Sequence, residues 1–159
     1  KVGHALEEGS QMGPVSSETQ LQSNLDYIEV GKKEAKLAYG GNPMNMRTPG
    51  YYMEPTLFID GDNKSTINQE EMFGPIACVI PVKSYEEGLE VANDTIFGLS
   101  SGIVTQSLSK AADFKCVSAF CFIEVFLSNP LQDSCDTTFS RIFFNIHLCR
   151  YFNSSLNLS

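Results

Sequence analysis

The chain has 159 residues, and its 11 Lys and Arg against 19 Asp and Glu give a net charge of −8. This length fits one or two small domains. The only basic run is Lys32-Lys33, so we expect no nucleic-acid partner, because neutralising phosphates needs clustered positive side chains. No apolar stretch reaches the roughly 20 residues of a membrane-spanning helix, so we expect no membrane span.

Residue types are distributed unevenly along the chain. All 12 Gly lie at or before Gly102, whereas 7 of the 11 Phe and 4 of the 5 Cys lie at or after Cys116. The sequence begins at Lys1 without an initiator Met or a secretory signal pattern, so we expect an internal fragment. Five irregularly spaced Cys make a poor disulfide framework, which favours a reducing, cytoplasmic location.

The first predicted helix follows Ser17, whose hydroxyl can cap it while Gln20 reaches back in a capping box. Apolar side chains recur at three- and four-residue steps as far as Ile28, and the helix is expected to end near Glu34. The pattern then predicts a strand at 35–39, a break at 40–43, a loop at 44–50, a strand interrupted by a proline at 51–59 and a turn at 60–63.

Further along, predicted strands alternate with predicted helices. Ile76 to Val82 is a nearly continuous apolar run, typical of a strand covered on both faces. A second capping box, Ser84 to Glu87, opens a helix, and a short strand is expected at 103–105. Either Ser107 or Ser109 can cap a third helix. This alternation predicts an α/β fold with a largely parallel sheet.

Two candidate metal sites fail on their residue types. Residues 60–71 place acidic and amide side chains at positions of a calcium-binding loop, but Lys64 and Ser65 stand where a ligand and a glycine are needed. The Cys and His residues lack the short paired spacing of a zinc site. We therefore expect no metal ion.

The segment Glu70 to Pro75 carries the densest group of functional side chains. Two carboxylates, the ring of Phe73 and a Gly-Pro turn stand directly before a predicted strand, at a sheet end where α/β proteins bind ligands. A carboxylate can accept hydrogen bonds from ribose hydroxyls, and an aromatic ring can lie against a flat cofactor. The alternative is a solvated acid pair with Phe73 in the core. Spacing alone favours this alternative.

Several segments together resemble the NAD(P)-dependent aldehyde dehydrogenase superfamily. They are GHALEEGSQMGPVSSETQ at 3–20, the Gly pair at 40–41, PTLFI at 55–59, EEMFGPIACVIPV at 70–82 and SYEEGLEVANDTIFGLSSGIVTQSLSKA at 84–111. EExFGP followed by AND and FGL is a specific combination, and the resemblance runs from Lys1 to about Phe114. The sequences of these segments are similar to those of bacterial semialdehyde-oxidising members, such as the 2-oxoglutarate semialdehyde dehydrogenases.

The resemblance implies part of an aldehyde dehydrogenase catalytic domain, incomplete at both ends. It implies that Glu71 binds the nicotinamide ribose of NAD or NADP and that Phe73 contacts the nicotinamide side. Gln20 corresponds to a more variable cofactor contact, and Asn93 and Gly98 to architectural positions. Complete members oxidise an aldehyde by thiolate attack, hydride transfer to NAD(P)+ and hydrolysis of the thioester, and they are expected to form homo-oligomers.

The sequence also departs from the family pattern. The nucleophilic Cys and the general-base Glu are expected upstream of Lys1, and Cys78 is no substitute because a thiol in a buried strand is usually inert. The helix that ends at Glu34 lacks the glycine that follows it in the family. After Phe114 the expected Gly-x-V-x-x-N strand is missing.

These departures predict two parts: a catalytic-domain fragment at 1–115 and a non-matching, Phe- and Cys-rich tail at 116–159, in which the pattern places no element. The isolated chain is expected to be inactive, since it lacks the nucleophile. The alternative function is that of a non-catalytic interaction protein or pseudoenzyme fragment, which associates with a full-length partner.

Overall fold

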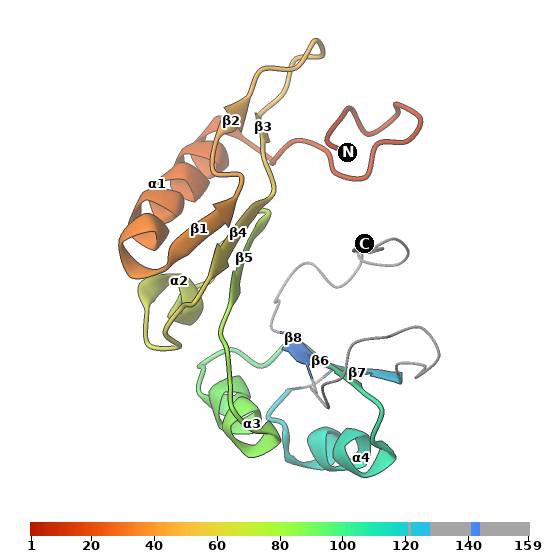
Figure 1. Cartoon of the computed structure of the whole chain (residues 1–159). Coiled ribbons are helices and arrows are strands. Elements are labelled where there is room, and N and C mark those ends of the chain that lie inside the picture. Colours follow the sequence, from red (N-terminus) through yellow and green to blue (C-terminus); the bar gives the residue numbers. More distant parts are fainter. Residues whose placement is uncertain (121, 128–140, 144–159) are drawn as a thin grey trace. The chain divides into compact units, whose positions relative to one another are not determined.

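The computed structural model describes residues 1–120, 122–127 and 141–143. They form two compact units, one from Lys1 to Pro81 and one that begins at Val82. Each unit combines helices with short strands (Figure 1). In this described part of the chain, the helices are too short or too polar for any of them to span a membrane.

The first unit contains two helices and two small sheets. Its elements in chain order are α1 (Glu18–Glu34), β1 (Lys36–Tyr39), β2 (Pro43–Met44), β3 (Tyr52–Met53), β4 (Thr56–Ile59), α2 (Thr66–Gln69) and β5 (Ile76–Val79). The larger sheet has the order β1-β4-β5, with β1 antiparallel and β5 parallel to β4. The smaller sheet is the antiparallel pair β2-β3.

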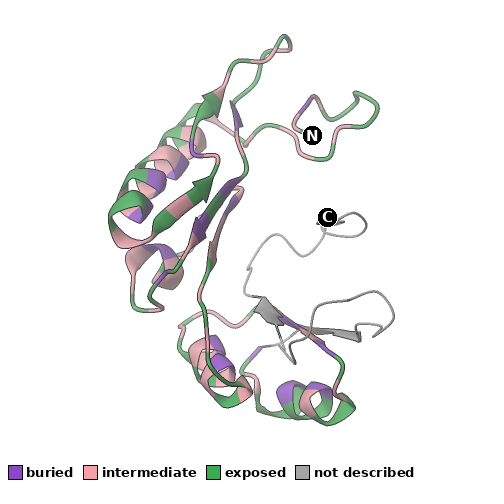
Figure 2. Cartoon of the chain, in the orientation of Figure 1, coloured by how far each residue is buried: buried purple, intermediate pink, exposed green. Residues whose placement is uncertain are grey.

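The core of the first unit lies between the β1-β4-β5 sheet and the helices α1 and α2 (Figures 1 and 2). Ile28 of α1, Phe58 of β4 and Ile67 of α2 are buried there. The opposite face of the sheet is largely exposed, as Leu57 is 36% and Val79 51% exposed. The prediction of a strand from Ile76 to Val82 covered on both faces was wrong for the described residues, because β5 ends at Val79 and they cover only one of its faces.

Helix α1 confirms the predicted first helix. Ser17 Oγ accepts the backbone N–H of Gln20 at 3.1 Å. Instead of completing the capping box, the Gln20 side chain donates from Nε2 to Asn24 Oδ1 at 3.0 Å. The helix ends at Glu34, and the C-cap residue Ala35 has an extended φ of −147° and donates its N–H to Gly31 O at 2.8 Å. The helix thus stops without a left-handed residue, which explains why the missing family glycine is tolerated.

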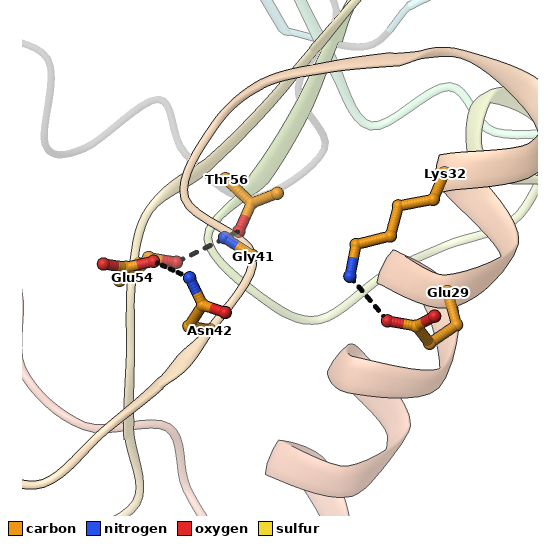
Figure 3. Close-up of polar contacts among 6 residues, drawn as sticks. All are labelled: Glu29, Lys32, Gly41, Asn42, Glu54 and Thr56. Atoms are coloured by element: carbon orange, nitrogen blue, oxygen red, sulfur yellow. Dashed lines mark hydrogen bonds and ion pairs between the residues drawn. The ribbon is translucent and has the colours of Figure 1, made fainter.

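A glycine turn leads from β1 to β2. Gly40 and Gly41 have φ angles of 75° and 97°, and a Cβ on Gly40 would overlap a backbone carbonyl oxygen. Gly41 N–H donates to Thr56 Oγ1 at 3.0 Å. Next to it, Asn42 Nδ2 donates to Glu54 Oε2 at 2.8 Å (Figure 3). These two hydrogen bonds fasten the turn to the start of β4.

Two elements of the first unit escaped prediction. Met44 lies in β2, so the loop expected at 44–50 begins one residue later. The four-residue helix α2 has no side-chain cap of its own; Glu34, at the end of α1, accepts from Thr66 Oγ1 at 2.6 Å and from Ile67 N–H at 3.2 Å. The hydrogen bond from Thr66 is the main cause that lowers the pKa of the Glu34 carboxyl.

The second unit contains a mixed sheet and two helices. Its elements are α3 (Tyr85–Asn93), β6 (Ser100–Thr105), α4 (Leu108–Val117), β7 (Phe122–Leu127) and β8 (Arg141–Phe143). β6 runs parallel to β7, to which α4 connects it, and antiparallel to β8. Ala92, Ile103 and Phe114 form the buried core of this unit.

Most predicted elements of the second unit are confirmed. The hydroxyl of Ser84 caps α3, and that of Ser107, rather than Ser109, caps α4. β6 begins at Ser100, three residues before the expected strand. Strand β7 lies in the segment in which the sequence pattern placed no element, and it lacks the Gly-x-V-x-x-N motif of the family. In each three-stranded sheet, the central strand pairs in parallel with one neighbour and antiparallel with the other. Since helices accompany both of these mixed sheets, the α/β class is confirmed.

Candidate cofactor-binding site

Residues 70–75 connect α2 to β5 and form the candidate site. Two tight turns shape them, because Gly74 N–H donates to Met72 O and Ile76 N–H donates to Gly74 O, both at 2.9 Å. The first residue of β4 then donates its N–H to Pro75 O at 2.8 Å. The Gly-Pro motif therefore turns the chain directly into the parallel pair β4-β5.

Helix α1 holds the same segment through two side chains. Tyr27 Oη donates to Glu70 Oε2 at 2.7 Å, and Asn24 Nδ2 donates to Phe73 O at 3.3 Å. The hydrogen bond to Glu70, followed by desolvation and the charge of Glu70, raises the pKa of the Tyr27 hydroxyl. The first carboxylate of the motif thus anchors the segment to the helix.

The structure brings Gln20 and Phe73 to the same buried side chain. Gln20 Nε2 donates to Asn24 Oδ1 at 3.0 Å, and Asn24 donates in turn to the Phe73 carbonyl. Glu71 lies two residues before Phe73 in the anchored segment and is partly buried. All three residues that the family resemblance singled out therefore belong to α1 and the segment next to it.

The ring of Phe73 does not serve as a core plug. It is 49% exposed and lies outside the buried cluster of the first unit. An exposed ring two residues from a partly buried carboxylate offers an apolar surface and an acceptor for hydroxyl groups. This pairing suits a ligand that carries a flat ring on a sugar.

Of the two described thiols, that of Cys78 is a poor candidate for an activated nucleophile. Cys78 packs against the core of the first unit, and burial raises the pKa of its thiol more than hydrogen bonds with Asn68 and Gly61 lower it. Cys116 is exposed on α4. The other three Cys, at 121, 135 and 149, lie outside the described residues.

The rejected calcium loop is a hydrogen-bonded turn. Asp62 Oδ1 accepts from Lys64 N–H at 2.9 Å, and Asp62 O accepts from Ser65 Oγ at 2.6 Å. Among the residues that the structure describes, no group of three or more His, Cys, Asp or Glu could hold a metal ion.

Sequence reasoning missed Asn24 and Tyr27. A signal for Asn24 was present, since it lies three residues after Leu21 and four before Ile28, within the apolar stripe of the helix. A polar side chain at such a position has to find hydrogen-bond partners when it is buried. No local pattern reveals the partner of Tyr27, because Glu70 lies 43 residues further along the chain.

Comparison with known proteins identifies the family. The sequence profile of the aldehyde dehydrogenase family matches residues 1–122. The chain is 42% identical over 116 residues to the alpha-ketoglutaric semialdehyde dehydrogenase of Bacillus subtilis, a match that covers 71% of this chain and 24% of that protein. It is 41% identical over 107 residues to a 1-pyrroline-5-carboxylate dehydrogenase of Bacillus licheniformis, covering 67% of this chain and 20% of that protein.

Solved structures agree with the sequence matches. The 1-pyrroline-5-carboxylate dehydrogenase from Thermus with bound NAD superposes with a TM-score of 0.71 at 38% identity, over 78% of this chain and 23% of that chain. The betaine aldehyde dehydrogenase of Staphylococcus aureus in complex with NAD+ gives a TM-score of 0.75 at 28% identity, over 79% of this chain and 25% of that chain. The chain spans about a quarter of the length of these relatives. Since motif order, fold and matches agree, the chain belongs to the aldehyde dehydrogenase family, whose members use NAD(P).

Proposed function

We propose that Glu71 and Phe73 form the nicotinamide-ribose part of an NAD or NADP site in an aldehyde dehydrogenase, with Gln20 as a further cofactor contact. The observation that carries the proposal is the half-exposed ring of Phe73, whose own backbone is fixed by a hydrogen bond to a buried residue. The Glu71 carboxylate would accept hydrogen bonds from the ribose hydroxyls, and the Phe73 ring would pack against the nicotinamide. The bound cofactor supplies the hydride acceptor.

The complete protein is proposed to oxidise an aldehyde to a carboxylate through a Cys thiohemiacetal. A semialdehyde is the substrate class suggested by the name of the Bacillus subtilis relative. We place the nucleophilic Cys and the general-base Glu upstream of Lys1, and we propose a cytoplasmic location and homo-oligomers. Burial raises the pKa of the Cys78 thiol, which argues against Cys78 as that nucleophile.

The division at residue 115 stays a prediction. The profile match continues to residue 122, and β7, which begins there, pairs in parallel with β6. Sequencing the transcript tests the proposed non-matching tail at 116–159. An uninterrupted reading frame through Phe114, with the tail present in the expressed protein, would contradict it.

The alternative function, association with a full-length family member, has its own support. Tyr39, Leu57 and Val79 of the β1-β4-β5 sheet are exposed apolar side chains, and exposed apolar surface favours association. Co-purification of this chain with a full-length aldehyde dehydrogenase, lost on Leu57→Asp, would favour this function. A chain that stays monomeric beside the partner would exclude it.

Cofactor titration of the purified chain tests the main proposal. Glu71→Ala is expected to weaken NAD+ binding about tenfold or more, as hydrogen bonds to a charged group contribute about 1.5–3 kcal/mol. The matched control is Glu29→Ala, which removes one exposed acid from the ion pair with Lys32 on α1 (Figure 3). Equal NAD+ affinity in Glu71→Ala and wild type would refute the cofactor role. Aldehyde-dependent formation of reduced cofactor by this chain alone would refute the proposal that the chain lacks the nucleophilic Cys.

A further inference from the structure

Asn24 is a fully buried amide on the apolar side of α1. Burying an amide is unfavourable unless its polar atoms find partners. Here Nδ2 donates to Phe73 O at 3.3 Å and to Met53 Sδ at 3.5 Å, while Oδ1 accepts from Gln20 Nε2 at 3.0 Å. The side chain is therefore satisfied by partners on α1, on β3 and in the segment 70–75.

These partners fix the orientation of two amides. A carbonyl oxygen and a thioether sulfur can only accept, so the nitrogen of the Asn24 amide must face Phe73 and Met53. Its oxygen then faces Gln20, which must present its own nitrogen. The Gln20 side chain then has its oxygen Oε1 as its acceptor for a ligand hydroxyl.

Steric contact adds a second constraint at the next residue. A Cβ on Gly74 would overlap Asn24 Nδ2 and would lie 2.5 Å from Cγ and 2.7 Å from Oδ1. The backbone at Gly74 thus lies directly against the Asn24 amide. One buried side chain contacts the Phe73–Gly74 turn by hydrogen bonding and by packing, and it also holds Gln20.

We propose that Asn24 is the positioning residue of the cofactor site, because it fixes both the Phe73–Gly74 turn and the Gln20 amide that are proposed to contact the cofactor. This inference rests on the proposed function for the identity of the ligand. The positioning itself exists without ligand, so the two can be tested separately. Asn24 acts through Gln20 and Phe73 and is not itself expected to touch the cofactor.

The test compares Asn24→Leu with the matched variant Ile28→Val on the full chain. Both positions are fully buried on α1, but Ile28 makes its contacts within the core. In ligand-free NMR spectra, Asn24→Leu is expected to shift the amide resonances of Phe73 and Gly74 and to accelerate Gly74 hydrogen exchange about tenfold. Ile28→Val leaves these resonances in place. Unchanged Phe73 and Gly74 resonances in Asn24→Leu would overturn the inference, whether or not NAD+ binds.

Titration with NAD+ supplies the functional readout. Asn24→Leu is expected to weaken NAD+ binding about threefold to tenfold, whereas Ile28→Val preserves the affinity. If the wild-type chain binds no NAD+, the proposed function fails, and the ligand-free spectra still decide the positioning role. If wild type binds and Asn24→Leu binds equally well, the positioning role fails alone.

A second variant keeps the test decisive if Asn24→Leu does not fold. Gln20 lies at a partly exposed helix position, so Gln20→Glu preserves the fold while placing a carboxylate against the Asn24 oxygen. Two acceptors repel, so the side-chain NH2 resonances of Asn24 and the amide of Phe73 are expected to shift. Unchanged Asn24 side-chain resonances would show that Gln20 and Asn24 are not coupled.

Discussion

Replacing Gly74 by alanine tests the packing of the candidate site most directly. The added Cβ would lie 2.5 Å from Asn24 Cγ and closer still to Nδ2, so reaching an ordinary contact of 3.4 Å requires a displacement of at least 3.4 − 2.5 = 0.9 Å. Asn24 is fully buried and bonded on three sides, so the displacement falls on the 70–75 segment. Overpacking of this kind costs about 1–3 kcal/mol. Gly74 has no positive φ, so the penalty is steric.

Chemical denaturation of the purified chain measures the change in the free energy of unfolding. Gly13→Ala is the control, because a Cβ there meets nothing within 4 Å, and its effect is expected to stay within about 0.5 kcal/mol. Combining Gly74→Ala with Asn24→Ala makes room for the methyl group, so the double variant should be more stable than the sum of the single changes by about 1 kcal/mol. Additive effects, or a Gly74→Ala variant as stable as Gly13→Ala, would refute the reasoning.

Two further predictions concern titratable groups. Glu34→Gln is expected to lower the free energy of unfolding by about 1 kcal/mol at neutral pH, because Glu34 caps α2. Since the folded-state pKa of Glu34 is lowered, its contribution is complete above the ordinary value of 4.5 and disappears as the pH falls through the folded-state pKa; a pH-independent difference between wild type and variant would contradict this. Alkylation at pH 8, followed by mass spectrometry, is expected to modify Cys116 about tenfold faster than Cys78, because Cys116 is exposed and burial raises the pKa of the Cys78 thiol. Equal alkylation rates would refute this effect of burial.

Local patterns in the sequence predicted three of the four described helices, α1, α3 and α4. Ser17, Ser84 and Ser107 each cap a helix, because a capping interaction spans only three residues and can be recognised from spacing. The apolar stripe of α1 likewise predicted that Ile28 faces the core, because helical periodicity is also a short-range pattern. Short-range hydrogen bonding and periodicity thus account for much of the secondary structure.

Features that depend on distant partners could not be predicted. Helix α2 is capped by Glu34, which lies 32 residues before Thr66, and no spacing rule connects the two. The pairing of Met44 with Tyr52 likewise became visible only in the folded chain. At the candidate site, the family resemblance pointed to residues of the EExFGP motif, but the buried amide of Asn24 that holds their backbone required the structure.

The attachment of residues 70–75 to α1 also bears on the order of folding. The helix can form from local contacts, whereas the hydrogen bonds to Glu70 and Phe73 join residues 43 and 49 positions apart. Closing loops of this length reduces chain entropy, and the finished core must offset that loss. We therefore expect the surface proposed to meet the cofactor to become ordered only after α1 has formed. The proposed function then predicts that a nascent chain gains affinity for the nucleotide only once the first unit is complete.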